Sequence, residues 1–129
     1  MKISDIRKYD SEKMYEAYEK WPKISQESYK KDLPKIQFKN VDHIVFAGVG
    51  GSGTIGDVIS SILSKNDIHV NVVKGYLLPK TVDSNTLIIT TSVSGNSKEA
   101  LTVLQNAKKS KGKFVAFSSG GKMKKYSIK

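Results

Sequence analysis

Two apolar, strand-like runs constrain the fold of this chain most, because each leads into a turn rich in glycine or serine and then into a helical pattern. The first run, His43–Ala47, precedes the turn at residues 48–53, and the second, residues 87–91, precedes the turn at residues 92–97. Such a turn places hydroxyls and backbone N–H groups at a helix N-terminus, where a partial positive charge favours an anion. Two of them in one small domain predict a ligand that carries a phosphate group.

Strand and helix patterns alternate from residue 40 onward. The predicted elements are strands at residues 43–47, 69–74, 87–91 and 113–117 and helices at 54–63 and 96–109. Strands that are apolar on both faces and alternate with helices predict the α/β class, here a three-layer α/β/α sandwich with a parallel, flavodoxin-like sheet.

The sheet is expected to lack its last βα unit, because only residues 122–129 follow Gly120 and Gly121 and they suffice for a helix start at most. The strand at residues 113–117 would then be an unprotected edge. This favours a homo-oligomer or a missing second domain. Residues 40–129 therefore form the predicted, C-terminally incomplete domain.

Residues 1–39 are predicted to be a helical lead-in to that domain. Asp10 or Ser11 can cap a helix that runs to about Lys20 and ends at Pro22, and a second short helix spans residues 25–32 before Pro34.

The composition excludes several classes of protein. The absence of cysteine excludes disulfides and thiolate chemistry, and His43 and His69 are too isolated for a usual metal cluster, so no metal site is predicted. No run approaches the roughly 20 apolar residues of a membrane span, and no signal-peptide core follows Met1. The expected location is the cytoplasm, with no membrane partner.

The net charge of +10 raises the question of nucleic acid. The excess lies in C-terminal lysines, namely Lys108, Lys109, Lys111, Lys113, Lys122, Lys124, Lys125 and Lys129. Arg7 is the only arginine, whereas base readout and bidentate phosphate clamps favour arginine. A solvated basic face is the better interpretation, and nucleic acid is disfavoured as a partner.

The first turn fits two interpretations. Gly48, Gly50 and Gly53 match the dinucleotide fingerprint, but that fingerprint also requires a carboxylate at the end of the second strand, where Val73 and Lys74 stand. A nucleotide is therefore disfavoured, and no cofactor is predicted.

The second interpretation places both turns at one phosphate pocket. Ligands of open parallel sheets bind at the carboxyl ends of strands, which would make the two turns neighbours. Gly50 and Gly51 allow close approach of the backbone to a substrate. The pocket is completed by the hydroxyls of Ser92, Ser94 and Ser97 and by backbone N–H groups of Gly95, Asn96 and Ser97. The alternative is that Ser94 and Asn96 only cap the following helix.

These residues resemble the SIS (sugar isomerase) domain, and most closely the archaeal-type bifunctional phosphoglucose/phosphomannose isomerases. That family writes the first turn G-M-G-G-S-G/A and the second S-Y-S-G-N-T-x-E, where this sequence has G-V-G-G-S-G from Gly48 and S-V-S-G-N-S-K-E from Ser92. Ser97 replaces threonine and keeps the hydroxyl, while Val49 and Val93 replace larger residues and are expected to alter the shape of the pocket.

The resemblance implies a sugar-phosphate-binding domain in which Ser52, Ser92, Ser94 and Ser97 contact the sugar phosphate. It further implies the N-terminal part of an aldose–ketose isomerase that converts glucose 6-phosphate or mannose 6-phosphate to fructose 6-phosphate. The catalytic residues are unknown, because the family's base belongs to a second SIS domain and the partner subunit. This chain alone is expected to be inactive, and a non-catalytic sugar-phosphate-sensing module is the alternative.

Overall fold

The computed structural model describes residues 3–32 and 35–127, which fall into two units divided after residue 36. The first unit holds helices α1 (Ile3–Tyr9) and α2 (Met14–Lys30). The second unit holds the strands β1 (His43–Ala47), β2 (His69–Val73), β3 (Thr86–Thr91) and β4 (Lys113–Phe117) and the helices α3 (Gly51–Leu63), α4 (Lys98–Lys109) and α5 (Gly121–Ser127).

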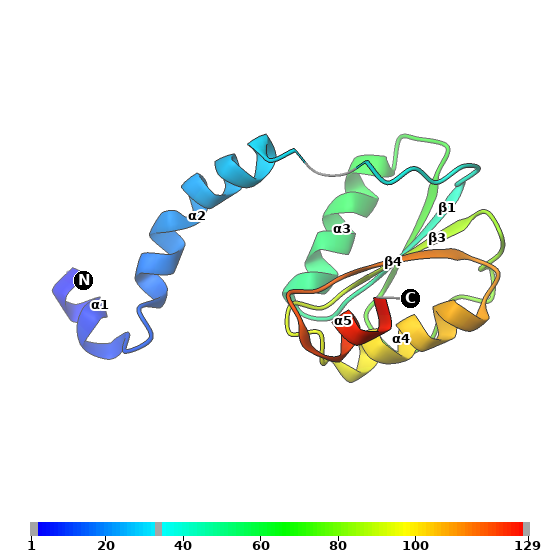
Figure 1. The fold of residues 1–129 in the computed structure, drawn as a ribbon. Helices are drawn as coiled ribbons and strands as arrows, with labels where there is room; N and C mark the ends of the chain where they lie inside the picture. Colours follow the sequence, from blue (N-terminus) through cyan, green and yellow to red (C-terminus); the bar gives the residue numbers. More distant parts are fainter. Residues whose placement is uncertain (1–2, 33–34, 128–129) are drawn as a thin grey trace. The chain divides into compact units, whose positions relative to one another are not determined.

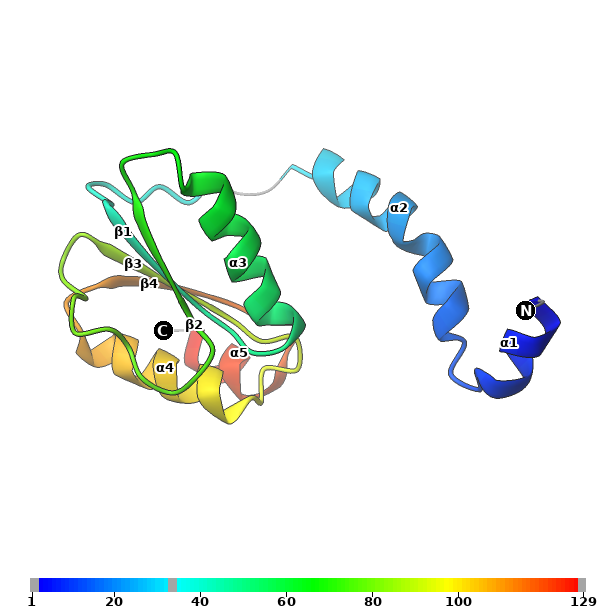
Figure 2. The same ribbon diagram turned by 180° about the vertical axis from the view of Figure 1, so that it is seen from behind.

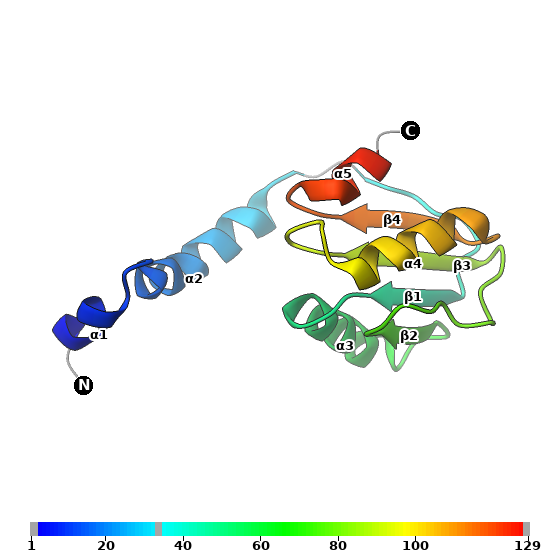
Figure 3. The ribbon, with the colours of Figure 1, turned by 90° about the horizontal axis from the view of Figure 1, so that it is seen from below.

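The four strands form one parallel sheet in the order β2-β1-β3-β4. The arrows in Figure 3 lie in this order and point the same way. In register, Ala47 at the end of β1 lies opposite Val73 of β2 and Thr90 of β3. These four strands follow the flavodoxin-like order, so the predicted fold class is confirmed, and β4 is an edge strand of the sheet that the described residues form.

Helices cover both faces of the sheet, which confirms the three predicted layers. Helix α3 lies on one face, and α4 and α5 lie on the other (Figures 1 and 2). Val103 and Ala107 of α4 pack with Val45 and Ile88 of the sheet in the main core cluster. Burial of these aliphatic side chains provides the driving force that holds α4 on its face.

Close approach of α3 to the sheet depends on Gly56. A Cβ atom at this position would lie 2.6 Å from Cδ1 of Phe46 and 3.0 Å from Cγ1 of Val72. Because interiors are packed as densely as organic crystals, no side chain fits there without movement of the helix. Gly56 therefore fixes the distance at which the helix that follows the first turn rests on β1 and β2.

The N-terminal unit differs from the prediction. Helix α2 continues through Pro22 to Lys30, where a break and two helices were expected, and α1 was not expected at all. Proline removes only one backbone donor, and the residues around it can continue the remaining hydrogen-bond ladder. The N-cap residue of α2 is Lys13 and not Asp10 or Ser11, although the Asp10 carboxylate does accept the N–H groups of Met14 at 2.9 Å and Tyr15 at 2.7 Å.

Helix α2 buries none of its residues, and Pro34, the expected stop of the second helix, lies outside the described residues. Within the described ranges, no helix combines the length and the apolar character needed to cross a membrane.

Substitution of Gly56 by alanine is expected to destabilise the domain. Overpacking against Phe46 costs about 1–3 kcal/mol, and the better helix propensity of alanine returns up to about 1 kcal/mol. Urea unfolding followed by circular dichroism measures the difference. Gly75→Ala is the control, because its Cβ would meet nothing within 4 Å. Equal stability of Gly56→Ala and the wild type would show that α3 does not depend on this contact.

Candidate functional site

The two glycine- and serine-rich turns lie side by side at the carboxyl ends of β1 and β3. β1 and β3 are parallel neighbours, and Ala47 lies opposite Thr90, so the loops that follow them leave the sheet together. The sequence predicted this neighbourhood, and the strand order confirms it.

The first turn forms the N-terminus of α3. Gly50 has φ 58°, and its carbonyl accepts the N–H groups of Gly53 at 3.0 Å and Thr54 at 3.2 Å. The helix thus begins at Gly51, three residues before the predicted start at Thr54, because the glycine turn itself closes the first helical turn. Ser52 lies in that first turn and is 9% exposed.

The second turn, residues 92–97, is called the serine loop below, and its hydroxyls bond within the loop. The hydroxyls of Ser92 and Ser97 lie 2.8 Å apart. The Ser92 hydroxyl also accepts the N–H of Gly95 at 3.2 Å, and the Ser94 hydroxyl accepts the N–H of Asn96 at 3.2 Å. Ser92 is 3% exposed, Ser97 is half-buried and Ser94 is exposed, so the network runs from the interior to the surface.

The capping alternative for Ser94 and Asn96 is wrong for α4. Ser97 is the N-cap residue of α4, and no side chain makes a capping hydrogen bond there. The side-chain oxygen of Asn96 accepts the N–H of Lys122 in α5 instead, at 3.1 Å. The serine hydroxyls are thus not consumed by the helix that they precede.

All four serines that the sequence singled out line one cavity of about 430 Å³. The lining consists of Val49, Gly51, Ser52, Ile55, Ser92, Val93, Ser94 and Ser97. Gly50, Gly95 and Asn96, also expected at the site, belong to the same turns but are not part of the lining. Ile55 was missed, although its position three residues after Ser52 places both on one face of a helix.

The cavity lining is electrically neutral, because it consists of hydroxyls, aliphatic side chains and backbone. The polarity of the site comes from the serine hydroxyls and from the start of α3, whose first turn contributes Gly51 and Ser52 to the lining. A helix N-terminus carries partial positive charge, so the lining suits an anion without a cationic side chain. Among the described residues, no group of three histidine, aspartate or glutamate side chains could hold a metal ion.

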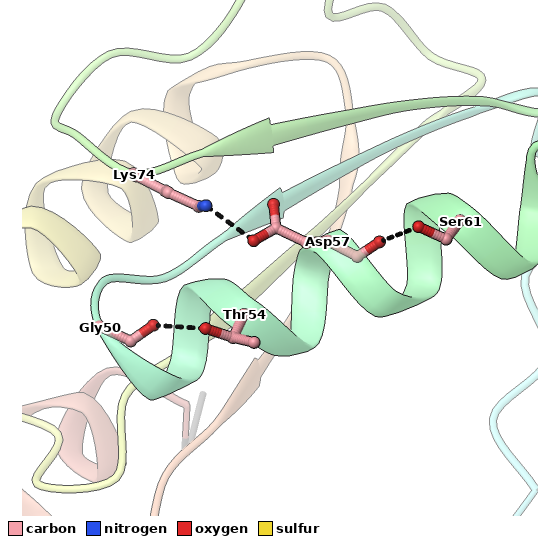
Figure 4. Close-up of polar contacts among 5 residues, drawn as sticks. All are labelled: Gly50, Thr54, Asp57, Ser61 and Lys74. Carbon is pink, nitrogen blue, oxygen red and sulfur yellow. Dashed lines mark hydrogen bonds and ion pairs between the residues drawn. The ribbon is translucent and has the colours of Figure 1, made fainter.

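Lys74, which follows β2, is paired with Asp57 of α3. Its Nζ lies 2.7 Å from the Asp57 carboxylate, and Figure 4 shows this bridge between the strand end and the helix. Both side chains are about half exposed, so the pair contributes only about 0–1 kcal/mol. The same figure shows Thr54 donating to Gly50 O and Ser61 donating to Asp57 O along α3.

Glu99, in the first turn of α4, is bonded to Tyr76 in the segment after β2. The Tyr76 hydroxyl donates to a Glu99 carboxylate oxygen at 3.0 Å. This hydrogen bond, together with the negative charge of Glu99, raises the pKa of Tyr76 above its ordinary 10.0. Glu99 thus accepts a hydrogen bond from a tyrosine and is not part of the cavity lining.

His43 lies at the opposite end of the sheet, where the strands begin. It is the first residue of β1, and its ring nitrogens lie 3.0 Å from Thr86 Oγ1 and 2.8 Å from Asn71 Oδ1. The Thr86 hydroxyl also donates to the Asp83 carboxylate at 2.9 Å. The ring therefore ties three strands together, far along the sheet from the carboxyl ends that form the cavity.

A family model described as the SIS domain matches residues 37–123. The bifunctional phosphoglucose/phosphomannose isomerase of Caldicellulosiruptor bescii is 36% identical over 120 residues, which cover 90% of this chain and 35% of that protein. The D-glucosamine-6-phosphate 4-epimerase of Sulfolobus acidocaldarius is 30% identical over 112 residues, which cover 86% of this chain and 35% of that protein. The chain thus spans about a third of the length of these relatives.

Solved structures share the fold. A candidate phosphosugar isomerase from Bacillus subtilis superposes with a TM-score of 0.59 at 21% identity, over 70% of this chain and 30% of that one. A candidate phosphosugar isomerase from Salmonella typhimurium gives a TM-score of 0.57 at 15% identity, over 76% of this chain and 37% of that one.

The Tyr76–Glu99 bond gives a prediction for the titration of the phenol. Deprotonation removes the donor and places a phenolate beside a carboxylate, so the folded-state pKa lies above the unfolded value. The bond therefore stabilises the fold below pH 10 and is lost as the pH rises through the raised pKa. NMR titration of tyrosine ring signals should show Tyr76 titrating at a lower pH in Glu99→Gln than in the wild type. No difference between the two would contradict the contact.

Proposed function

We propose that this chain, which belongs to the SIS domain family, binds the phosphate group of a sugar phosphate in the cavity between the first turn and the serine loop. The observation that carries the proposal is the convergence of Ser52, Ser92, Ser94 and Ser97 on one neutral cavity beside the start of α3. A volume of about 430 Å³ lies in the range of small-molecule sites.

The hydrogen bonds inside the serine loop orient its hydroxyls for donation. Ser94 accepts the N–H of Asn96, which directs a lone pair to the backbone and leaves the hydroxyl proton for a phosphate oxygen. In the Ser92–Ser97 pair one hydroxyl donates to the other, so one proton of the pair is also available. Hydrogen bonds to an ionised acceptor are about twice as strong as neutral ones, which is how a neutral lining can hold a phosphate dianion.

We further propose that the chain is the phosphate-binding, N-terminal part of an isomerase that interconverts glucose 6-phosphate or mannose 6-phosphate and fructose 6-phosphate. Relatives named as phosphoglucose/phosphomannose isomerases and as a glucosamine-6-phosphate epimerase support a phosphorylated hexose as the ligand. Moving a proton between C1 and C2 requires a positioned base. No described residue of the cavity lining carries a carboxylate or an imidazole, so the base is assigned to another part of the full enzyme or to a partner subunit.

A sugar-phosphate-sensing module without catalysis is the second candidate, favoured by the same lack of a base in the lining. Cytoplasmic location and oligomerisation are part of the proposal as well. The edge position of β4 supports the latter, since an open strand edge favours pairing.

Calorimetric titration with fructose 6-phosphate tests the binding site. The wild-type chain should bind saturably, and Ser94→Ala should weaken binding about 10- to 100-fold, the effect of one lost hydrogen bond to a charged group. Ser61→Ala is the matched control, because Ser61 is exposed and bonds only along α3 to Asp57 O. A wild-type chain that does not bind at millimolar ligand would overturn the proposed function.

A coupled assay separates the two candidates. The 129-residue chain alone should form no glucose 6-phosphate from fructose 6-phosphate, because its cavity lacks a base. Addition of the remaining two-thirds of the Caldicellulosiruptor bescii relative should produce turnover if the chain is part of an isomerase. Binding without turnover in that mixture favours the sensing module, and turnover by the chain alone would contradict the assignment of the base to another part.

A further inference from the structure

The segment from the end of β4 to the first turn of α5 is bonded to the serine loop at four points. Two bonds come from the end of β4 and the turn after it, and two come from α5 itself. They are Ser92 N to Phe117 O at 3.0 Å, Ser119 N to Val93 O at 3.2 Å, Met123 N to Gly95 O at 2.9 Å and Lys122 N to Asn96 Oδ1 at 3.1 Å. The end of β4, the turn after it and α5 thus all hold the loop through their backbone groups.

Two glycines let the two segments approach closely. Gly95 and Gly121 both have φ +66°, a conformation that other residues rarely adopt. A Cβ atom on Gly95 would lie 2.0 Å from Gly120 O, and one on Gly121 would lie 2.3 Å from Ser94 O. The backbones therefore interlock with no space for a side chain on either of these residues.

Met123 anchors this arrangement from the other side. It is fully buried in a cluster with Ala100 and Leu104 of α4, so α5 packs against the helix that follows the serine loop. Displacement of the start of α5 would therefore be transmitted to the loop, because neither helix can move without opening this cluster.

We propose that the start of α5 sets the serine loop in its phosphate-binding conformation, with Asn96 and Gly121 as positioning residues. The proposal rests on the proposed function, since it concerns the same site. Asn96 and Gly121 act on the carbonyl of Ser94 and on the turn after it, and the Ser94 hydroxyl is the group that faces the cavity. Hydrogen bonds weaken steeply with misalignment, so a shift of this turn lowers the affinity for phosphate without removing any contact group.

The experiment uses two adjacent glycines of the full chain. Gly121→Ala forces a Cβ toward Ser94 O, whereas Gly120→Ala meets nothing within 4 Å and has no left-handed φ. Calorimetry with fructose 6-phosphate and with inorganic phosphate should give dissociation constants about tenfold higher for Gly121→Ala, a change of 1.4 kcal/mol, and within about twofold of wild type for Gly120→Ala. The dissociation constants of both ligands should rise by the same factor, because in the proposed site the displaced turn binds the phosphate group that the two ligands share.

A second pair of variants keeps the test decisive if Gly121→Ala does not fold. Asn96→Ala removes the bond to Lys122, and its control Lys108→Ala removes a bond of 2.8 Å from Lys108 Nζ to Tyr126 O at the far end of α5. Asn96→Ala should raise the dissociation constants of both ligands about tenfold, the effect of a lost hydrogen bond at the site. Lys108→Ala should leave the dissociation constants unchanged at a temperature well below the unfolding midpoint. Equal affinities of Asn96→Ala and Lys108→Ala would overturn the proposal.

Amide hydrogen exchange in the ligand-free chain separates this proposal from the proposed function. The backbone amides at positions 95 and 96 should exchange at least about tenfold faster in Asn96→Ala than in Lys108→Ala, because the loop is released locally. If the wild type binds neither ligand, the proposed function fails while faster exchange still supports control of the loop by α5. If exchange at these amides is unchanged, the positioning role is wrong whatever the wild type binds.

Discussion

Parallel pairing of β1 with β3 is the constraint on which the site depends. With Ala47 opposite Thr90, β1 and β3 end at the same end of the sheet, and the turns that follow them line one cavity. An antiparallel pair would send one of these turns to the opposite end of the strands, about 17 Å away for five residues. Each turn alone is an ordinary helix start, and only their juxtaposition brings Ser52 to the hydroxyls of the serine loop.

The site offers directed hydrogen bonds in place of cationic side chains. Lys74, at the end of β2, is paired with Asp57, and the cavity lining is neutral. A lysine can follow a displaced phosphate, because its attraction depends weakly on angle, whereas a hydroxyl or an amide cannot. The neutral phosphate site that we propose therefore demands a rigid loop, and we infer that rigidity from the close approach of the Gly95 and Gly121 backbones.

Local patterns predicted most of the domain, because its strands are apolar runs with sharp turn signals at their ends. β1 and β4 begin and end at the predicted residues, and the serines gather where the turns placed them. Continuity of α2 through Pro22 was not predictable, since some helices end at a proline and others continue through it with a kink. The partner of Asn96 was hidden as well, because Lys122 stands 26 residues away and nothing in the loop itself points to it.

The same geometry separates binding from chemistry. Glu99 stands two residues after Ser97, yet its carboxylate accepts a hydrogen bond from the Tyr76 hydroxyl and is not part of the cavity lining. Neither of the two groups that could act as a base lines the cavity, since Glu99 faces Tyr76 and His43 is engaged at the opposite end of the strands. In the function that we propose, the domain fixes the phosphate end of a substrate. Fixing one end in this way orients the carbons at the other, so a base supplied from elsewhere meets them in a defined position.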